Sequence, residues 1–151
     1  MLFRSNLQRN KVKLIIDSVD LIHSLDSLDL AKEIDKQAKK VGRTVRVLIE
    51  INSGREEQKG GIMPEDAEEF FLALKQFSSI EVCGLMTMGP VVENPEDMRP
   101  YFRETKALYD RLNGNHGFAC GILSMGMSDS YVVAIEEGAT LVRVGRKLFN
   151  G

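Results

Sequence analysis

Two serines and a glycine alternate in residues 123–129, whose sequence is LSMGMSD. Ser124, Gly126 and Ser128 lie where the apolar pattern predicts that a strand gives way to a helix. Unpaired backbone N–H groups and the positive end of the helix dipole at such a point favour a phosphate group. The alternative is a structural role, in which Ser128 caps its own helix and Gly126 makes the turn.

A second polar group ends the next predicted strand. Arg143 interrupts the apolar run 139–144, and a guanidinium is rarely buried without a partner. Gly145 lets a ligand approach the backbone, and Arg146 adds positive charge. The alternative is that Arg143 faces solvent. Because ligand sites of α/β proteins lie at the carboxyl ends of strands, we expect the two segments to form one anion-binding site.

Weaker candidates follow an earlier predicted strand. Glu50 and Asn52 end the run 44–51 and can reach the mouth of the sheet, although surface positions suit them equally well. Lys59 lies in a glycine-containing loop from which it could contact a ligand. Met88 is expected in the core or in a pocket wall.

Other kinds of site find little support. His23 and His116 lack the spacing of metal ligands, and no nucleophile-elbow sequence supports a catalytic triad. Cys83 and Cys120 lie among apolar neighbours, and two such cysteines make neither a disulfide framework nor a zinc cluster. We therefore expect buried, inert thiols, and we assign no metal ligand and no catalytic residue.

Short apolar runs alternate with amphipathic segments along the chain. Runs that predict strands cover residues 20–25, 44–51, 80–88, 119–125 and 139–144. Helical spacing of apolar residues predicts helices over 28–41, 64–77 and 98–113, and a short one from Ser128 to Gly138. Gly42 and Gly114 are placed to end the first and third of these helices.

This alternation predicts right-handed βαβ units, and therefore an α/β fold that is either doubly wound or a barrel. A (β/α)8 barrel takes about 250 residues, whereas this chain has 151 residues and offers five or six strands. It is incomplete as a barrel and complete as an open sheet. In both cases we expect a single domain over residues 1–151, because no linker or repeat interrupts the pattern.

The composition excludes several classes of protein. Hydrophobic residues make up 43% and charged residues 28% of the chain, which is typical of a globular domain. A net charge of −2 without a basic run argues against a nucleic-acid partner. No apolar run approaches the roughly 20 residues that cross a bilayer, and no signal peptide is recognisable. We therefore expect a cytoplasmic protein without a membrane partner.

Several segments resemble the YggS/PROSC family of pyridoxal-phosphate homeostasis proteins, which share the fold of the alanine racemase N-terminal domain. They include NLQRNK at 6–11, VLIEIN at 47–52, GLMTM at 84–88, SMGMSD at 124–129 and VRVG at 142–145. The resemblance covers the C-terminal portion of the family only. It implies an incomplete (β/α)8 TIM-type barrel that lacks the first two strands.

The resemblance also implies a site for pyridoxal 5′-phosphate. Its cofactor-binding residues would be those of the two segments above: Ser124, Gly126, Met127, Ser128, Arg143, Gly145 and Arg146. Ser128 and the adjacent backbone would hold the phosphate, and Gly145 with the N–H of Arg146 would complete the cradle. Arg143 would face the pyridine nitrogen and keep it unprotonated, which weakens the cofactor as an electron sink.

Departures from the family limit the implied activity. The family holds the cofactor through a lysine in a segment resembling AVSKT, and this chain has no such segment. We therefore expect weak, non-covalent binding and a homeostasis role without catalysis. The alternatives are part of a pyridoxal-phosphate-dependent amino-acid racemase, and an open-sheet module for another phosphorylated small molecule.

A barrel without two of its strands has exposed sheet edges and an uncovered apolar interior. Such edges pair with other chains. We therefore expect self-association, or completion by a separate N-terminal fragment.

Overall fold

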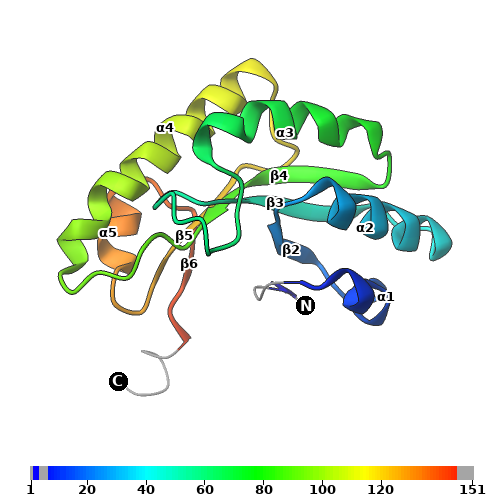
Figure 1. Cartoon of the computed structure of the whole chain (residues 1–151), viewed down its shortest axis with the longest axis horizontal. Helices are drawn as coiled ribbons and strands as arrows, with labels where there is room; N and C mark the ends of the chain where they lie inside the picture. The colour runs from blue at the N-terminus through cyan, green and yellow to red at the C-terminus, as the bar shows by residue number, and fades with distance from the viewer. Residues whose placement is uncertain (1, 4–6, 146–151) are drawn as a thin grey trace.

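A single parallel sheet organises the chain in the computed structural model, which describes residues 2–3 and 7–145 (Figure 1). Its six strands lie in the order β1-β2-β3-β4-β5-β6, and each neighbouring pair is parallel. The strands are β1 (Leu2–Phe3), β2 (Leu21–Leu25), β3 (Val45–Ile51), β4 (Ile80–Thr87), β5 (Ile122–Met127) and β6 (Leu141–Arg143).

Helices connect the successive strands. The α-helices are α1 (Val12–Ile15), α2 (Leu28–Lys40), α3 (Ala67–Ala73), α4 (Arg99–Asn115) and α5 (Tyr131–Glu136). Short 3₁₀ turns adjoin three of them: η1 (Arg9–Lys11), η2 (Pro64–Asp66), η3 (Leu74–Gln76) and η4 (Pro95–Met98).

The strand order decides between the two expected architectures. A doubly wound sheet reverses its strand order, whereas here each strand pairs with the next one along the chain. Sequential parallel strands joined by helices are the arrangement of a βα barrel. The incomplete barrel is therefore confirmed, and the open doubly wound sheet is wrong.

The core lies mainly between the helices and the outer face of this sheet. Val45, Val47, Ile49 and Ile51 alternate along β3 and are at most 1% exposed. They belong to the large apolar cluster that includes residues of all five α-helices. Leu48 points to the opposite, inner face, where it packs in a smaller cluster. A strand apolar on both faces is what this fold requires.

Helix α2 shows how local sequence sets an element. The Ser27 hydroxyl accepts a hydrogen bond from the Leu30 N–H at 3.1 Å and caps the helix. Gly42 follows the last turn with a φ of 70°, in the left-handed conformation expected there. The predicted helix over residues 28–41 is therefore confirmed.

Three predicted boundaries differ from the structure. Gly114 does not end its helix, because α4 continues to Asn115 and Gly117 takes the left-handed conformation, with a φ of 79°. Ser128 does not cap α5, since Ser130 holds the N-cap position. The predicted strand 119–125 lies at Ile122–Met127 instead, because pairing with both neighbouring strands fixes it there.

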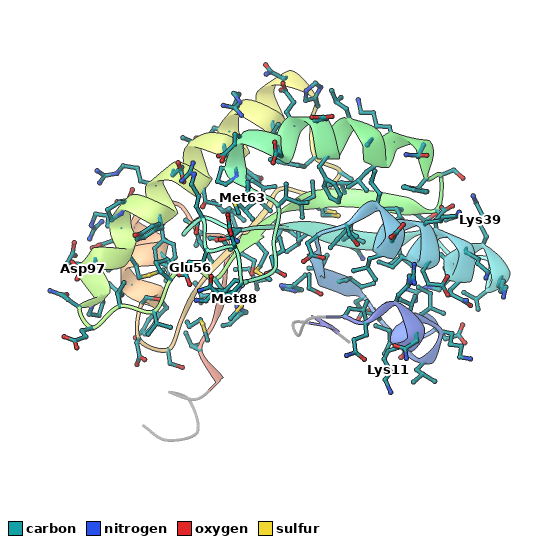
Figure 2. All side chains as sticks on the ribbon, viewed as in Figure 1. Lys11, Lys39, Glu56, Met63, Met88 and Asp97 are labelled. Atoms are coloured by element: carbon teal, nitrogen blue, oxygen red, sulfur yellow. The ribbon has the colours of Figure 1, made fainter. Side chains whose placement is uncertain are left out.

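The segments that follow β3 and β4 meet near the centre of the molecule. Figure 2 shows Glu56 and Met88, one from each segment, close together, whereas Lys39 lies at the far end of α2. The carboxyl ends of the parallel strands thus converge. In the part of the chain that the structure describes, no helix has both the length and the apolar character that crossing a bilayer requires.

Candidate functional site

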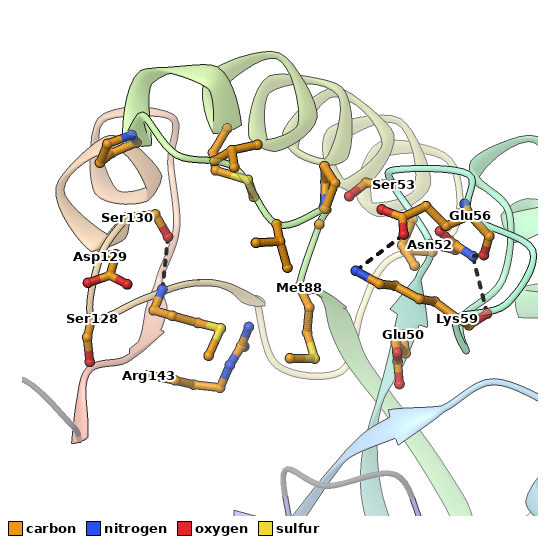
Figure 3. Close-up of a pocket in the computed structure, with 18 of the residues that line it drawn as sticks. Glu50, Asn52, Ser53, Glu56, Lys59, Met88, Ser128, Asp129, Ser130 and Arg143 are labelled. Carbon is orange, nitrogen blue, oxygen red and sulfur yellow. Dashed lines mark hydrogen bonds and ion pairs between the residues drawn. The ribbon is translucent and has the colours of Figure 1, made fainter.

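A cavity of about 910 Å³ opens at the carboxyl ends of β3 to β6 (Figure 3). This is the volume of a small-molecule site, and it lies where α/β folds bind ligands. One wall comes from the end of β5, the turn after it and β6, and the other from the end of β3 and its loop. The segment after β4, with Met88, lies between them.

Arg143 is fixed in the first wall by two hydrogen bonds. Its Nη1 donates to the Ser124 Oγ at 2.6 Å, and its Nη2 donates to the Thr87 carbonyl oxygen at 3.1 Å. Ser124 is fully buried, and its Oγ also lies 3.5 Å from the His23 Nδ1. The arginine that interrupts an apolar strand therefore has buried partners on β4 and β5 and reaches the cavity.

The turn after β5 supplies hydroxyl and backbone groups to the same wall. Met127 and Ser128 line the cavity, and Ser128 is 7% exposed. The Ser130 Oγ accepts a hydrogen bond from the Met127 N–H at 3.2 Å, and the Ser130 N–H donates to the Met127 carbonyl at 3.0 Å. These two bonds hold the turn and place Ser128 at the cavity (Figure 3).

Gly126 serves the packing of this turn. Its φ is 99°, and a Cβ there would lie 2.5 Å from the Ala134 Cβ. Glycine therefore lets α5 pack closely on β5. Gly145 is half-buried and does not line the cavity, and Arg146 lies outside the described residues. Of the predicted site residues, the structure brings Met127, Ser128 and Arg143 to the cavity, with Ser124 directly behind Arg143.

The second wall is organised by Asn52. Its Nδ2 donates to the carbonyl oxygens of Glu56 at 2.8 Å and Lys59 at 3.4 Å, and its Oδ1 accepts from the Glu56 N–H at 3.1 Å. The Lys59 Nζ lies 3.4 Å from the Glu56 Oε2. The side chain that ends β3 thus folds the loop back over the cavity and places an ion pair there (Figure 3).

Glu50 has an unusual environment in this wall. Burial raises the pKa of Glu50 to about 7, and the negative charge of Asp26 acts in the same direction, whereas Arg143 opposes both. Asp26 itself accepts a hydrogen bond from the Gly61 N–H at 3.0 Å. The cavity therefore contains a carboxyl group that gains or loses its proton near neutral pH.

Sequence reasoning missed part of this lining. Glu56 and the segment Pro90–Val92 line the cavity, yet neither shows a pattern that points to a ligand. Asn52, a polar residue at the end of a predicted strand, was the feature of the sequence that could have indicated an ordered loop after β3. Nothing comparable marks the segment after β4, because a cavity wall built from valine and proline resembles an ordinary loop.

The chain is similar in sequence and in fold to known proteins. The family model described as "Alanine racemase, N-terminal domain" matches residues 1–151. The chain belongs to this family. It is 51% identical over 147 residues to the pyridoxal phosphate homeostasis protein of Aquifex aeolicus (strain VF5), and the match covers 97% of the chain and 64% of that relative. The chain therefore spans somewhat less than two thirds of that relative's length.

Solved structures show the same relationship. PipY of Synechococcus elongatus PCC7942, solved without PLP, superposes with a TM-score of 0.90 at 29% identity, over 99% of this chain and 70% of PipY. The structure of PipY with PLP bound gives a TM-score of 0.86 over 99% of this chain and 69% of PipY. The YggS/PROSC resemblance found in the sequence is thereby confirmed.

Proposed function

We propose that this chain binds pyridoxal 5′-phosphate in the cavity at the carboxyl ends of β3 to β6, as part of a pyridoxal-phosphate homeostasis protein. The observation that carries the proposal is the fixed guanidinium of Arg143, which lines the same cavity as Ser128. A family relative was solved with PLP bound, which supports the same ligand here.

The residues present fit this cofactor. Its phosphate is a dianion, and the Ser128 hydroxyl with the backbone of the adjacent turn would hold it. Arg143 would face the pyridine nitrogen and keep it unprotonated. Met88 and Met127 line the cavity and offer apolar contacts to a flat ring. Gly145 and Arg146 remain proposed members of the phosphate cradle, and Ser124 acts by holding Arg143.

The proposed role is binding and release of the cofactor rather than turnover. When bound, pyridoxal phosphate supplies an aldehyde that reacts reversibly with amines. The chain's own residues would bind and orient it, and Arg143 would limit its use as an electron sink. We propose weak, non-covalent binding, and we assign no catalytic residue.

A titration of the full chain with pyridoxal phosphate tests the cavity assignment. Arg143→Gln and Ser128→Ala should each weaken binding by about 10- to 100-fold in calorimetry, because each removes a polar contact to the ligand. Arg111→Gln and Ser78→Ala are the matched controls, since both positions are exposed on the surface and neither lines the cavity. Equal binding by all five proteins would place the ligand elsewhere.

A second experiment tests the non-covalent mode. The chain is incubated with pyridoxal phosphate and reduced with borohydride, and its intact mass is then measured by mass spectrometry. We expect no stoichiometric adduct. Lys59 lines the cavity, so an adduct that peptide mapping places there, and that Lys59→Arg removes, would contradict non-covalent binding.

We also propose that the sheet edges take a partner. β1 and β6 stand at the two ends of the strand order, so within the described chain each pairs with one strand only. An edge strand carries backbone groups that a further strand can pair with. The partner would be a second copy of this chain or an N-terminal fragment that supplies strands.

A further inference from the structure

Two cysteine thiols meet at the amino-terminal end of the sheet, away from the cavity. Cys83 lies in β4 and Cys120 just before β5, and their Sγ atoms are 3.0 Å apart. Strand pairing brings them together, because the Ala119 N–H donates to the Val82 carbonyl at 2.9 Å. Both thiols are free. The sequence led us to expect two buried, inert thiols; Cys83 is buried, whereas Cys120 is only partly buried and lies against it.

The two thiols have different surroundings. Cys83 is fully buried, and burial raises its pKa to about 12, with the neighbouring Cys120 acting in the same direction. Cys120 is partly exposed, and the Arg46 Nη1 lies 3.9 Å from its Sγ. The Arg46 guanidinium offsets the charge of the Glu81 carboxylate, an oxygen of which lies within 4.8 Å of the same sulfur. Cys120 is thus the accessible nucleophile, and Cys83 is a protonated thiol within reach of it.

We propose that Cys83 and Cys120 form an oxidant-sensitive modification site, which closes to an intramolecular disulfide when the chain meets a hydroperoxide. The Cys120 thiolate attacks the O–O bond of hydrogen peroxide and becomes a sulfenic acid, while the other oxygen leaves as hydroxide and is protonated to water. The Cys83 sulfur then attacks the sulfenic sulfur, and the S–S bond forms. The displaced hydroxide takes the proton of the Cys83 thiol and leaves as a second water. In sum, two electrons pass from the two thiols to the peroxide.

A metal site made from the same groups is the competing reading. One ligand atom each from Glu81, Cys83 and Cys120 lies within 4.8 Å of the others. Two sulfurs bound tetrahedrally to zinc at about 2.3 Å would stand roughly 3.8 Å apart, which exceeds the 3.0 Å observed. The positive charge of Arg46 also opposes a cation. Both observations favour the disulfide.

The proposed bond would link β4 to the segment that leads into β5, and both strands support the cavity. β4 provides the Thr87 carbonyl at its carboxyl end, and β5 provides Ser124 within the strand; these are the two acceptors for Arg143. The bond would also close the loop that contains α4. A constraint of this kind stabilises a fold mainly by restricting the unfolded chain. We therefore expect the oxidised chain to melt several degrees above the reduced chain.

The test treats the reduced full chain with a small excess of hydrogen peroxide and then alkylates it with N-ethylmaleimide in denaturant. We expect a monomer that has lost about 2 Da, takes no label, and takes two labels after treatment with dithiothreitol. Labelling of both cysteines after peroxide would overturn the proposal, as would disulfides that form only between chains.

Variants separate the two roles. Cys83→Ser should leave a sulfenic acid at Cys120 that dimedone traps, whereas Cys120→Ser should react with peroxide much more slowly. Arg46→Gln keeps both thiols and should slow closure about 3- to 10-fold, with Arg111→Gln as the matched surface control. Equal rates in these two arginine variants would contradict the assigned role of Arg46. Stoichiometric Zn²⁺ uptake that protects both thiols of the reduced chain from peroxide would assign the cluster to a metal and overturn the proposal.

Discussion

Arg143 links three strands in the wall of the cavity. It lies on β6 and donates to groups on β4 and β5. The Thr87 Oγ1 in turn donates to the Ile51 carbonyl at 2.8 Å and lies 2.7 Å from the Ser53 Oγ. Because Ser53, Thr87 and Ser124 are all buried, these bonds are protected from water. The guanidinium is therefore positioned before any ligand arrives, which lowers the entropic cost of binding.

Glu50 gives a residue-scale prediction for pH. Its pKa rises from 4.5 to about 7 in the folded chain, so the folded state holds the proton more tightly than the unfolded state. The contribution of Glu50 to the free energy of unfolding is fully present below about pH 4.5. It is lost as the pH rises through about 7, where the folded chain gives up the proton. Glu50→Gln should therefore raise the free energy of unfolding at pH 8 by about 1–2 kcal/mol.

The check is urea unfolding of both proteins at pH 4.5 and pH 8. The gain should nearly vanish at pH 4.5, where the carboxyl group is protonated in the folded state and half protonated in the unfolded state. Glu57→Gln is the control, because Glu57 is exposed and does not line the cavity. A gain of the same size at both pH values would show that the amide acts through packing and not through the proton.

At the scale of elements, the junction of β5 and α5 sets the geometry of the proposed phosphate side. The register between β5 and β6 shifts between Ser124 and Met127, and Gly126 has a positive φ within this stretch. This irregularity ends the strand in a turn that Ser130 stabilises. The close approach of α5 to β5 then depends on the missing side chain at residue 126.

Two glycine substitutions should have opposite effects. Gly126→Ala should destabilise the chain by about 2–4 kcal/mol, because its Cβ would clash with Ala134 and its φ suits glycine. Gly114→Ala should stabilise it by about 0.5–1 kcal/mol, because Gly114 lies inside α4 and a Cβ there meets nothing within 4 Å. Thermal unfolding of both variants checks the pair. A neutral Gly126→Ala would show that α5 can move away from β5 at little cost.

At the scale of the whole molecule, the sheet has two ends. A closed barrel has no edge strands, whereas β1 and β6 lie at opposite ends of this strand order. Apolar residues on the inner face, including Leu48 and Met86, form their own small cluster. Further strands, or a second copy of this chain, would pair with the two edge strands.

Self-association is the prediction at this scale. Light scattering of the purified chain should give a mass above that of the monomer, 16.9 kDa, and the mass should increase with concentration. A separately made fragment carrying the preceding part of a homeostasis relative should reverse the increase by binding the edges. A monomer at every concentration, unchanged by the fragment, would show that the edges take no partner.

Local signals were sufficient for most elements. The periodicity of apolar residues predicted α2, β3 and β4 to within one or two residues. It failed where long-range contacts decide. Gly114 looked like a helix end, yet the turn is made at Gly117. Ser128 looked like a helix cap, yet Ser130 holds the N-cap position, and its Oγ accepts a hydrogen bond from the Met127 N–H.

The α/β class, the family and the two segments that supply Ser128 and Arg143 can all be inferred from the sequence, because they depend on local patterns and short motifs. The contacts that those residues make are visible only in the folded chain. The fixing of Arg143 by Ser124 and Thr87, the raised pKa of Glu50 and the meeting of Cys83 with Cys120 all join groups far apart in the sequence. Strand register and burial create these contacts, and neither can be read from local spacing.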